Sequence, residues 1–348
     1  MLEISAILTT RNRASLLPIV LEGLKRQCLP SEYFEIVAID DGSSDETAVI
    51  LDRARAELPL RVLRQNHAGL AAAKNLGIFG SRAPIVVFLD DDDVADPRLL
   101  RAHVLAHKKY PEPEVAVLGY TELAPEVGKV PLMRHVTQVG CQLFSYGWIK
   151  PGMTLDYTCF WGGRSSCKRG LLVEHGIFNP VFGFGCEDIE LGWRLAQSRF
   201  RVIYEPAAMA TMIRTLGFRD FCGRSERQGR SQWRFAQLHP APAVRKYCEI
   251  DEGLALWADN MGRFLEFLVW AEKLDRLANV REAAGRPLDA RSQETLDQVY
   301  RTAFKLSRAK GIAQAAHDQV DDGNAEHGML ERCRFGYERR RPGASVPS

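Results

Sequence analysis

The chain has 348 residues, of which 46% are hydrophobic and 26% are charged, and its formal net charge is +2. This composition is typical of a globular protein with a substantial core, in one large or two smaller domains. The near-neutral charge gives no reason to expect nucleic acid as a partner.

The cellular location of the protein is predicted from the targeting and membrane signals that the sequence lacks. No apolar stretch is long enough to cross a membrane, and no basic region precedes the apolar run at the N-terminus. The eight cysteines contain no CxxC pair, which argues against a zinc site and favours free thiols in a reducing compartment. We therefore expect a cytoplasmic protein without a transmembrane span.

The first 120 residues alternate between apolar strands and helices. Strands are predicted at 4–9, 34–39, 60–63, 84–89 and 115–119, with helices at 15–27, 45–57, 69–79 and 97–110. This alternation predicts an α/β fold with a doubly wound parallel sheet, which binds ligands at the carboxyl ends of its strands. Three polar clusters fall at such ends, at residues 9–13, 40–44 and 90–93.

The remainder of the chain changes character twice. Residues 121–150 look loop-rich, 168–175 and 187–197 are predicted helices, and 201–204 is a predicted strand. Only helical patterns follow residue 213, notably 254–277 and 293–312, and the chain becomes polar and then basic from 321. We expect a catalytic domain at 1–213, an α-helical region at 214–320 and a disordered basic tail at 321–348.

Four consecutive aspartates, residues 90–93, follow the strand at 84–89. Their mutual repulsion is costly in a crevice, and a divalent cation would relieve it. Mg²⁺ or Mn²⁺ takes one or two carboxylates together with phosphate oxygens and water. The pattern thus favours metal-assisted binding of a diphosphate; the alternative is a solvated acidic turn with Asp96 as a helix cap.

Two further acidic pairs stand at functional positions. Asp40 and Asp41 could belong to a tight turn, or a carboxylate there could accept the imide N–H of uracil or thymine or the N1–H of guanine. Glu187 and Asp188 could simply complement the dipole of the helix that they begin. Alternatively, one of them is a general base held at a helix start behind a flexible, glycine-rich segment.

Five motifs together resemble the family-2 glycosyltransferases, inverting enzymes with the GT-A fold. They are ILTTRNR at 7–13, IDDGSSD at 39–45, GLAAAKN at 69–75, FLDDDD at 88–93 and GCEDIEL at 185–191. Each motif is weak by itself, but five in this order are specific, and the resemblance covers residues 3–215.

The resemblance implies a role for each candidate residue. Thr9, Arg11 and Asp41 would line the nucleoside pocket, Lys74, Asp90 and Asp91 would bind the donor, and Asp92 would hold Mn²⁺ or Mg²⁺. Asp188 would be the catalytic base with Glu187 beside it, and Arg164 and Ser166 would lie on the acceptor side. The expected reaction moves a sugar from a nucleotide diphosphate, with a UDP-sugar favoured, to a hydroxyl of a glycan, glycolipid or small-molecule acceptor.

Two departures from that family pattern stand out. Many relatives carry a metal-binding histidine after the strand that follows the catalytic helix, and residues 206–212 contain none. A strict QxxRW motif is also absent, because Gln232 precedes Trp233, and a processive polysaccharide synthase is therefore not expected.

Several features leave alternatives open. His103 and His107 have metal-compatible spacing, but a solvated helical face is the favoured interpretation. The basic stretch at 214–234 could be a solvated helix, a loop closing over the diphosphate, or a peripheral contact with anionic lipid. The later apolar stripes predict core or homodimer packing.

Two other functions remain possible from the sequence: a sugar-nucleotide nucleotidyltransferase and a non-catalytic sugar-nucleotide-binding scaffold.

Overall fold

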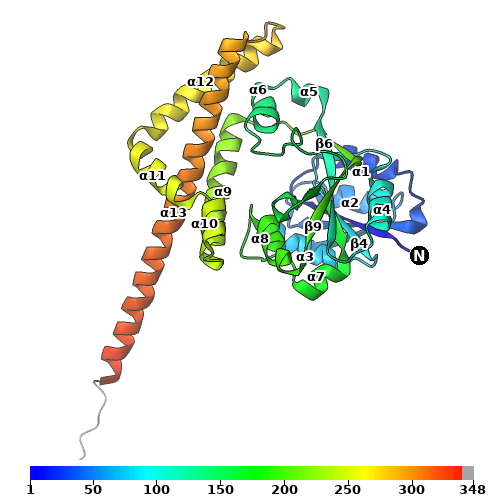
Figure 1. Ribbon diagram of the computed structural model, residues 1–348, viewed down its shortest axis with the longest axis horizontal. Helices are drawn as coiled ribbons and strands as arrows, with labels where there is room; N and C mark the ends of the chain where they lie inside the picture. The colour runs from blue at the N-terminus through cyan, green and yellow to red at the C-terminus, as the bar shows by residue number, and fades with distance from the viewer. Residues whose placement is uncertain (339–348) are drawn as a thin grey trace, which may run out of the picture.

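The chain up to Met212 is built on one mixed β-sheet of nine strands (Figure 1). The computed structural model describes residues 1–338, and its strands run in the order β3-β2-β1-β4-β8-β6-β9-β5, with β7 pairing β9. The strands are β1 (Ile4–Thr10), β2 (Phe34–Asp41), β3 (Leu60–Gln65), β4 (Ile85–Leu89), β5 (Asp93–Ala95), β6 (Val115–Leu123), β7 (Thr154–Leu155), β8 (Ser165–Lys168) and β9 (Arg201–Met212).

Only half of this sheet is purely parallel. Strands β3, β2, β1 and β4 run parallel, as the alternating pattern predicts. Beyond β4 the sheet is mixed and not parallel throughout as predicted, because β8 runs antiparallel to both β4 and β6, and β5 runs antiparallel to β9, whereas β6 and β9 run parallel. The four residues of β8, Ser-Ser-Cys-Lys, lack the apolar run by which the other strands were recognised.

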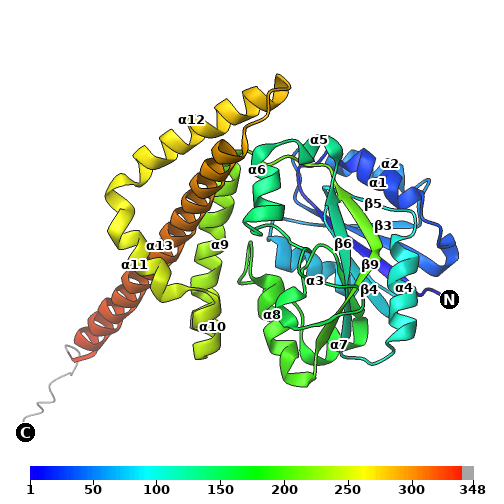
Figure 2. The same ribbon diagram turned by 45° about the horizontal axis from the view of Figure 1, so that its top comes forward.

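Helices cover both faces of the sheet (Figure 2). Apolar side chains of α1, α2 and α4 pack on one face, and those of α3, α7 and α8 pack on the other. These helices are α1 (Leu17–Lys25), α2 (Thr47–Ala54), α3 (Leu70–Gly80), α4 (Leu99–Lys109), α7 (Arg169–His175) and α8 (Glu187–Leu195). The insertion after β6 forms α5 (Pro125–Gly128), α6 (Pro131–Arg134) and the turn η2 (His135–Val139).

After β9 the described chain is helical, as the sequence predicts. The helices are α9 (Phe218–Leu238), α10 (Pro242–Tyr247), α11 (Ile250–Asn260), α12 (Phe264–Ala283) and α13 (Ala290–Glu338). Helix α13 extends far beyond the others in Figure 1. In the structure α13 continues through the segment predicted as a disordered tail as far as Glu338, and residues 339–348 lie outside the described part of the chain. The division into three regions stays a prediction.

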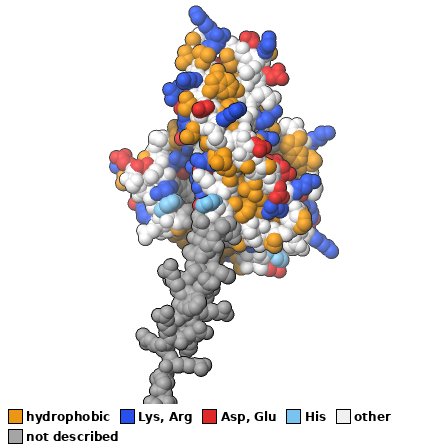
Figure 3. Space-filling model, turned by 90° about the vertical axis from the view of Figure 1, so that its left-hand side faces the viewer, with side chains coloured by type: hydrophobic (Ala, Val, Ile, Leu, Met, Phe, Trp, Pro, Cys, Tyr) orange, Lys and Arg blue, Asp and Glu red, His pale blue; other side chains and the backbone are white. Residues whose placement is uncertain are grey.

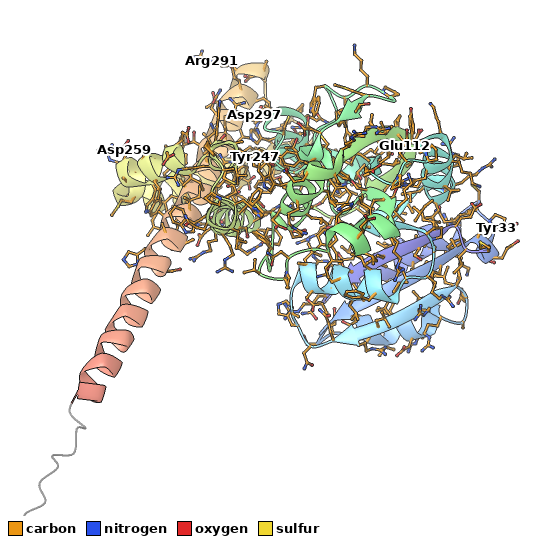
Figure 4. The ribbon with its side chains drawn as sticks, turned by 60° about the horizontal axis from the view of Figure 1, so that its bottom comes forward. Tyr33, Glu112, Tyr247, Asp259, Arg291 and Asp297 are labelled. Carbon is orange, nitrogen blue, oxygen red and sulfur yellow. The ribbon has the colours of Figure 1, made fainter. Side chains whose placement is uncertain are left out.

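The helical region shares a buried core with the insertion that follows β6. Phe218 and Phe221 of α9 pack with Tyr300 and Phe304 of α13 in one buried cluster. His135 Nδ1 lies 2.7 Å from an oxygen of Asp297, a residue of α13 labelled in Figure 4, and this hydrogen bond connects η2 to the helices.

Helix α12 carries an exposed apolar face, and Figure 3 shows the molecule from the helical side. Leu265, Val269, Trp270, Leu277 and Val280 are each between 46% and 71% exposed. None of the described helices has the length and hydropathy needed to cross a membrane. The predicted homodimer and the predicted peripheral membrane contact stay predictions.

Candidate active site

A cleft of about 1010 Å³ lies between the carboxyl edge of the sheet and the helical region. This volume is at the upper end of the range for small-molecule sites, about 300–1,000 Å³. The cleft brings together ten of the eleven candidate residues: Thr9, Arg11, Asp41, Lys74, Asp90, Asp91, Asp92, Arg164, Glu187 and Asp188.

The carboxylate of Asp188 is fixed at the first turn of α8. Its Oδ2 accepts a hydrogen bond of 2.9 Å from the Gly162 N–H, and its Oδ1 accepts one of 2.8 Å from the Ile189 N–H. Burial, followed by the charge of Glu187, raises the pKa of Asp188 to about 6, while Lys74 and the two N–H donors oppose the rise. A carboxyl group with this pKa is ionised at neutral pH and is a stronger base than an ordinary aspartate.

The segment before α8 is held in place, although its glycines predict flexibility. The Ser231 hydroxyl of α9 donates to the Phe184 carbonyl at 2.6 Å, and the Gln228 amide lies 3.2 Å from Cys186 Sγ. Cys186 adopts a left-handed conformation with φ of 63°, which turns the chain sharply into α8. Helix α9 therefore takes part in positioning Glu187 and Asp188.

Glu187 and Lys74 form a buried ion pair inside the cleft. Lys74 Nζ lies 2.9 Å from Glu187 Oε1, and both side chains are at most 5% exposed. Burial opposes the charged form of Lys74, but Glu187, Asp188 and Asp90 hold its pKa above the ordinary value. Lys74, expected to bind the donor, thus has its ammonium group committed to Glu187. The other oxygen of Glu187, Oε2, is buried without a hydrogen-bond partner among the described residues.

Arginines surround the four consecutive aspartates. Arg13 Nε lies 3.1 Å from Asp91 Oδ1, and Arg214 Nη1 lies 3.4 Å from Asp92 Oδ2. Arg164 Nη2 lies 3.2 Å from Asp90 and 3.4 Å from Asp93. Arg164, expected on the acceptor side, therefore holds the acidic cluster together.

These arginines do not fully relieve the repulsion. Burial, Asp90 and Asp91 raise the pKa of Asp92 to about 6, against the opposing effect of Arg214 and Arg13. Burial raises the pKa of the neighbouring Asp93 to about 7, with Arg164 opposing and Asp90 adding to the rise. A cation or a cationic ligand group would thus be stabilised beside the carboxylates that face the cleft.

The cleft offers part of a metal site. Among the described residues, no three His, Cys, Asp or Glu side chains are grouped so that they could hold a metal ion. Asp90 and Asp92 both line the cleft, and Mg²⁺ commonly binds one or two carboxylates plus substrate phosphates. The residues present fit a metal whose remaining ligands come from a bound diphosphate and water.

Asp41 lies in the cleft with all of its acceptor positions used. Oδ1 accepts from the Gln65 amide at 2.7 Å and the Ala68 N–H at 2.8 Å. Oδ2 lies 2.8 Å from His67 Nδ1 and accepts from the Gly69 N–H at 3.1 Å. Burial opposes ionisation, but these four contacts hold the pKa of Asp41 below its ordinary value. Base recognition by Asp41 would therefore displace one of the two side-chain partners.

Ser166 is the one candidate residue that does not line the cleft. Its hydroxyl lies 2.8 Å from His103 Nδ1 and 2.9 Å from His107 Nε2, and all three residues are buried. Burial lowers the pKa of His103 to about 3 and that of His107 to about 2, so both are neutral. The predicted solvated face of this helix is wrong, because α4 lays these histidines against β8.

Sequence reasoning did not assign roles to several cleft residues. Arg224 lies over the Phe184 ring with 5.0 Å between its guanidinium carbon and the ring centroid. Burial lowers the pKa of Arg224, while the charges of Asp90, Glu187 and Asp92 act in the opposite direction. The stretch 214–234 was recognised as basic, but its helical spacing alone could not show that Arg224 faces the acids.

The mixed sheet followed by C-terminal helices is a GT-A fold, and its cleft holds the acidic strand ends and the carboxylate at the start of α8. The model of the family described as "Glycosyl transferase family 2" matches residues 5–166. The chain belongs to this family.

Curated relatives support this assignment over part of their length. Validoxylamine A glucosyltransferase of Streptomyces hygroscopicus subsp. jinggangensis is 31% identical over 215 residues, which cover 55% of this chain and 51% of the relative. Pre-mycofactocin glycosyltransferase of Mycobacterium tuberculosis is 27% identical over 251 residues, which cover 70% of this chain and 50% of the relative. The chain thus spans about half the length of these relatives.

Solved structures show the same fold over most of the chain. Mannosyltransferase PcManGT from Pyrobaculum calidifontis, solved with GDP-Man and Mn²⁺, has a TM-score of 0.55 at 20% identity, covering 92% of this chain and 87% of its own. Staphylococcus aureus TarS 1-349 has a TM-score of 0.52 at 14% identity, and the match covers 91% of this chain and 92% of the TarS chain. Both matches extend well beyond the catalytic domain.

Proposed function

We propose that this chain transfers a sugar from a nucleotide diphosphate, with a UDP-sugar favoured, to an acceptor hydroxyl with inversion at the anomeric carbon. The observation that carries the proposal is the shared cleft: the oriented Asp188 carboxylate lines the same cavity as the acidic strand end that includes Asp92. The acceptor is a hydroxyl of a glycan, glycolipid or small molecule.

The choice of donor draws on related proteins. TarS 1-349 has been solved in complex with UDP, and PcManGT in complex with GDP-Man. Asp41 suits uracil and guanine equally, because both present an N–H donor where adenine and cytosine present an acceptor. The uridine nucleotide is the donor that we test first, with guanosine nucleotides as the comparison.

Asp188 is proposed as the general base. A hydroxyl is a poor nucleophile at neutral pH, so its proton must leave as it attacks. The acceptor oxygen forms a bond to the anomeric carbon, the proton passes to an oxygen of Asp188, and the bond to the diphosphate breaks. The electron pair of that bond leaves with the nucleoside diphosphate, and solvent later takes the proton from Asp188.

The leaving diphosphate would be stabilised by the acidic strand end and by the arginines that line the same cleft. Asp90 and Asp92 would hold Mn²⁺ or Mg²⁺, which when bound supplies positive charge to the leaving phosphate oxygens. Arg214 pairs with Asp92 at a long 3.4 Å, so a cation at Asp92 would release it toward phosphate. Arg224 adds a second guanidinium that has no carboxylate within ion-pair distance among the described residues.

A thermal-shift panel tests this function. UDP, GDP and ADP are added to the protein with Mn²⁺ or with chelator, and the Asp251→Asn variant, changed at an exposed residue that does not line the cleft, serves as the control. A ligand at 100 times its Kd stabilises the native state by about 2.7 kcal/mol. We expect stabilisation by UDP with Mn²⁺ in both proteins; stabilisation by none of the nucleotides would contradict the proposal.

A further inference from the structure

The helical wall of the cleft presents a row of cations on one face of α13. Arg301, Lys305 and Arg308 all line the cleft, at spacings of four and three residues, which place them on the same side of a helix. The row spans about 10 Å at 1.5 Å per residue. Phe304 lies within the same stretch, and Phe221 of α9 contacts its ring.

The position of this row is fixed by close packing of α9 on α13. A Cβ atom at Gly229 would lie 2.0 Å from the Arg308 carbonyl oxygen, and one at Gly311 would lie 2.0 Å from the Glu226 carbonyl oxygen. The two backbones can approach this closely only because both positions are glycine. Helix α13 therefore cannot move away from the cleft without breaking the contact with α9.

Most of the charge on this row is not neutralised by the protein. Arg308 pairs with Glu249, the one acidic residue that the helical region contributes to the lining. Arg301 has only a long 3.5 Å contact with Gln298, and exposed Lys305 has no carboxylate within ion-pair distance among the described residues.

Basic residues of the same helices that do not line the cleft fall into two groups. Arg219 pairs with Glu272, Arg230 with Asp318 and Lys310 with Glu226. Arg227, Arg234 and Arg291 have no carboxylate within ion-pair distance among the described residues, so Arg301 and Lys305 are distinguished by their place in the cleft and not by the missing partner alone.

The row lies at a different part of the wall from the proposed diphosphate site. The largest cationic influences on Asp92 come from Arg214 and Arg13. Arg308 instead acts on Cys186, the residue that directly precedes Glu187 and Asp188. Arg308, at one end of the row, therefore lies near the residues that carry the proposed base, whereas Arg301, at the other end, acts on His135 of η2.

We infer that the acceptor is an anion, carrying a phosphate or a carboxylate group that binds Arg301 and Lys305. The inference rests on the proposed function, since it assigns this part of the cleft to the acceptor. Charge-assisted hydrogen bonds from the guanidinium and ammonium groups would hold the anionic group, while Phe304 and Phe221 contact apolar parts of the same molecule. Binding would position the acceptor hydroxyl toward Asp188.

The test is anion binding to protein whose nucleotide site is saturated with UDP. Tripolyphosphate and citrate are titrated calorimetrically, without divalent cations and at low salt, into the wild type, the Arg301→Ala/Lys305→Ala double variant and Arg291→Ala. Arg291 is an exposed residue near the start of the same helix and does not line the cleft (Figure 4). It therefore controls for the loss of one positive charge elsewhere on the same helix.

We expect the wild type and Arg291→Ala to bind at least one anion equally, and the double variant to bind it at least tenfold more weakly with an unchanged Kd for UDP. The anion that binds more tightly indicates phosphate or carboxylate chemistry. Equal binding by all three proteins, or no binding of either anion to the wild type, would overturn the inference. Failure of UDP to bind in a parallel titration with Mn²⁺ would count against the proposed function instead, and the comparison of the variants without UDP would still show whether Arg301 and Lys305 bind the anion.

Discussion

Replacing Asp188 with asparagine would separate catalysis from folding. The amide keeps the shape of the side chain and can accept one of the two hydrogen bonds from the Gly162 and Ile189 N–H groups, but it cannot take a proton. The account therefore predicts a large loss of turnover together with little loss of stability.

The size of the stability effect follows from two opposing terms. Raising the Asp188 pKa from 3.8 to about 6 means that its ionised form costs the folded state about 3 kcal/mol at neutral pH. Asparagine removes that cost but leaves one N–H without its acceptor, at about 1–3 kcal/mol. Because the terms nearly cancel, the free energy of unfolding at pH 7 should be equal to the wild type or higher.

The pH dependence of the free energy of unfolding tests separately whether ionised Asp188 destabilises the folded protein. The folded-state pKa of Asp188 lies above its unfolded value, so the folded protein binds more protons between pH 4 and pH 6. Through this group the wild type loses stability as the pH rises across that window. The asparagine variant should lack this contribution.

The assay compares kcat at saturating donor with the midpoint of urea unfolding. General-base catalysis contributes about 10²–10⁴-fold, so kcat of Asp188→Asn should fall at least a hundredfold, equivalent to about 2.7 kcal/mol, with donor affinity unchanged. The neighbouring Glu187→Gln is the contrast, because it leaves Lys74 buried without its partner and should lower stability by about 3–5 kcal/mol. A kcat of Asp188→Asn within tenfold of the wild type would refute the assignment of the base.

Other predictions concern pH, metal and nucleoside binding. At saturating donor, kcat should rise with pH and be half-maximal near pH 6, because Asp188 must be ionised to accept a proton; a flat profile between pH 5 and 8 would exclude this. Asp92→Asn should weaken UDP binding at least tenfold by calorimetry with Mn²⁺ and hardly at all with chelator; equal weakening in both buffers would mean that Asp92 does not act through a metal. Asp41→Asn should lower the free energy of unfolding by at least about 2 kcal/mol in urea titrations, because an amide cannot accept all four hydrogen bonds; unchanged stability would show that these contacts contribute little.

The sequence was most informative where local pattern and function coincide. The parallel strands are apolar runs that end in polar clusters, so both their existence and the edge at which the clusters meet were predictable. The same rule indicated Asp92, whereas Asp188 was assigned only through the resemblance to the family-2 glycosyltransferases; both residues line one cleft although they are distant in the chain. The GT-A class is confirmed by the family match and by the solved folds.

What the sequence could not supply are contacts between distant segments. Nothing local indicates that Lys74 is committed to Glu187, or that Gln65 and His67 occupy Asp41. Strand β8 was missed because it contains two serines, one of which bonds to two histidines that were interpreted as solvated. The roles of the candidate residues stay predictions.

The helical region illustrates the same limit. Amphipathic spacing predicted helices after residue 213, but the cleft-facing side of α13 depends on how it packs against α9. Two glycines, Gly229 and Gly311, set that packing, and they carry no sign of it in the sequence. The row of Arg301 and Lys305 was therefore visible only in the folded chain.

The most direct test of the account is the configuration of the sugar released when the protein slowly hydrolyses its donor, because this needs no known acceptor. Water would take the place of the acceptor hydroxyl, and proton NMR recorded before mutarotation reads the anomeric form. The account predicts a β-sugar from an α-linked UDP-sugar, and no release by Asp188→Asn. Release of the α-sugar by the wild type would contradict in-line attack assisted by Asp188.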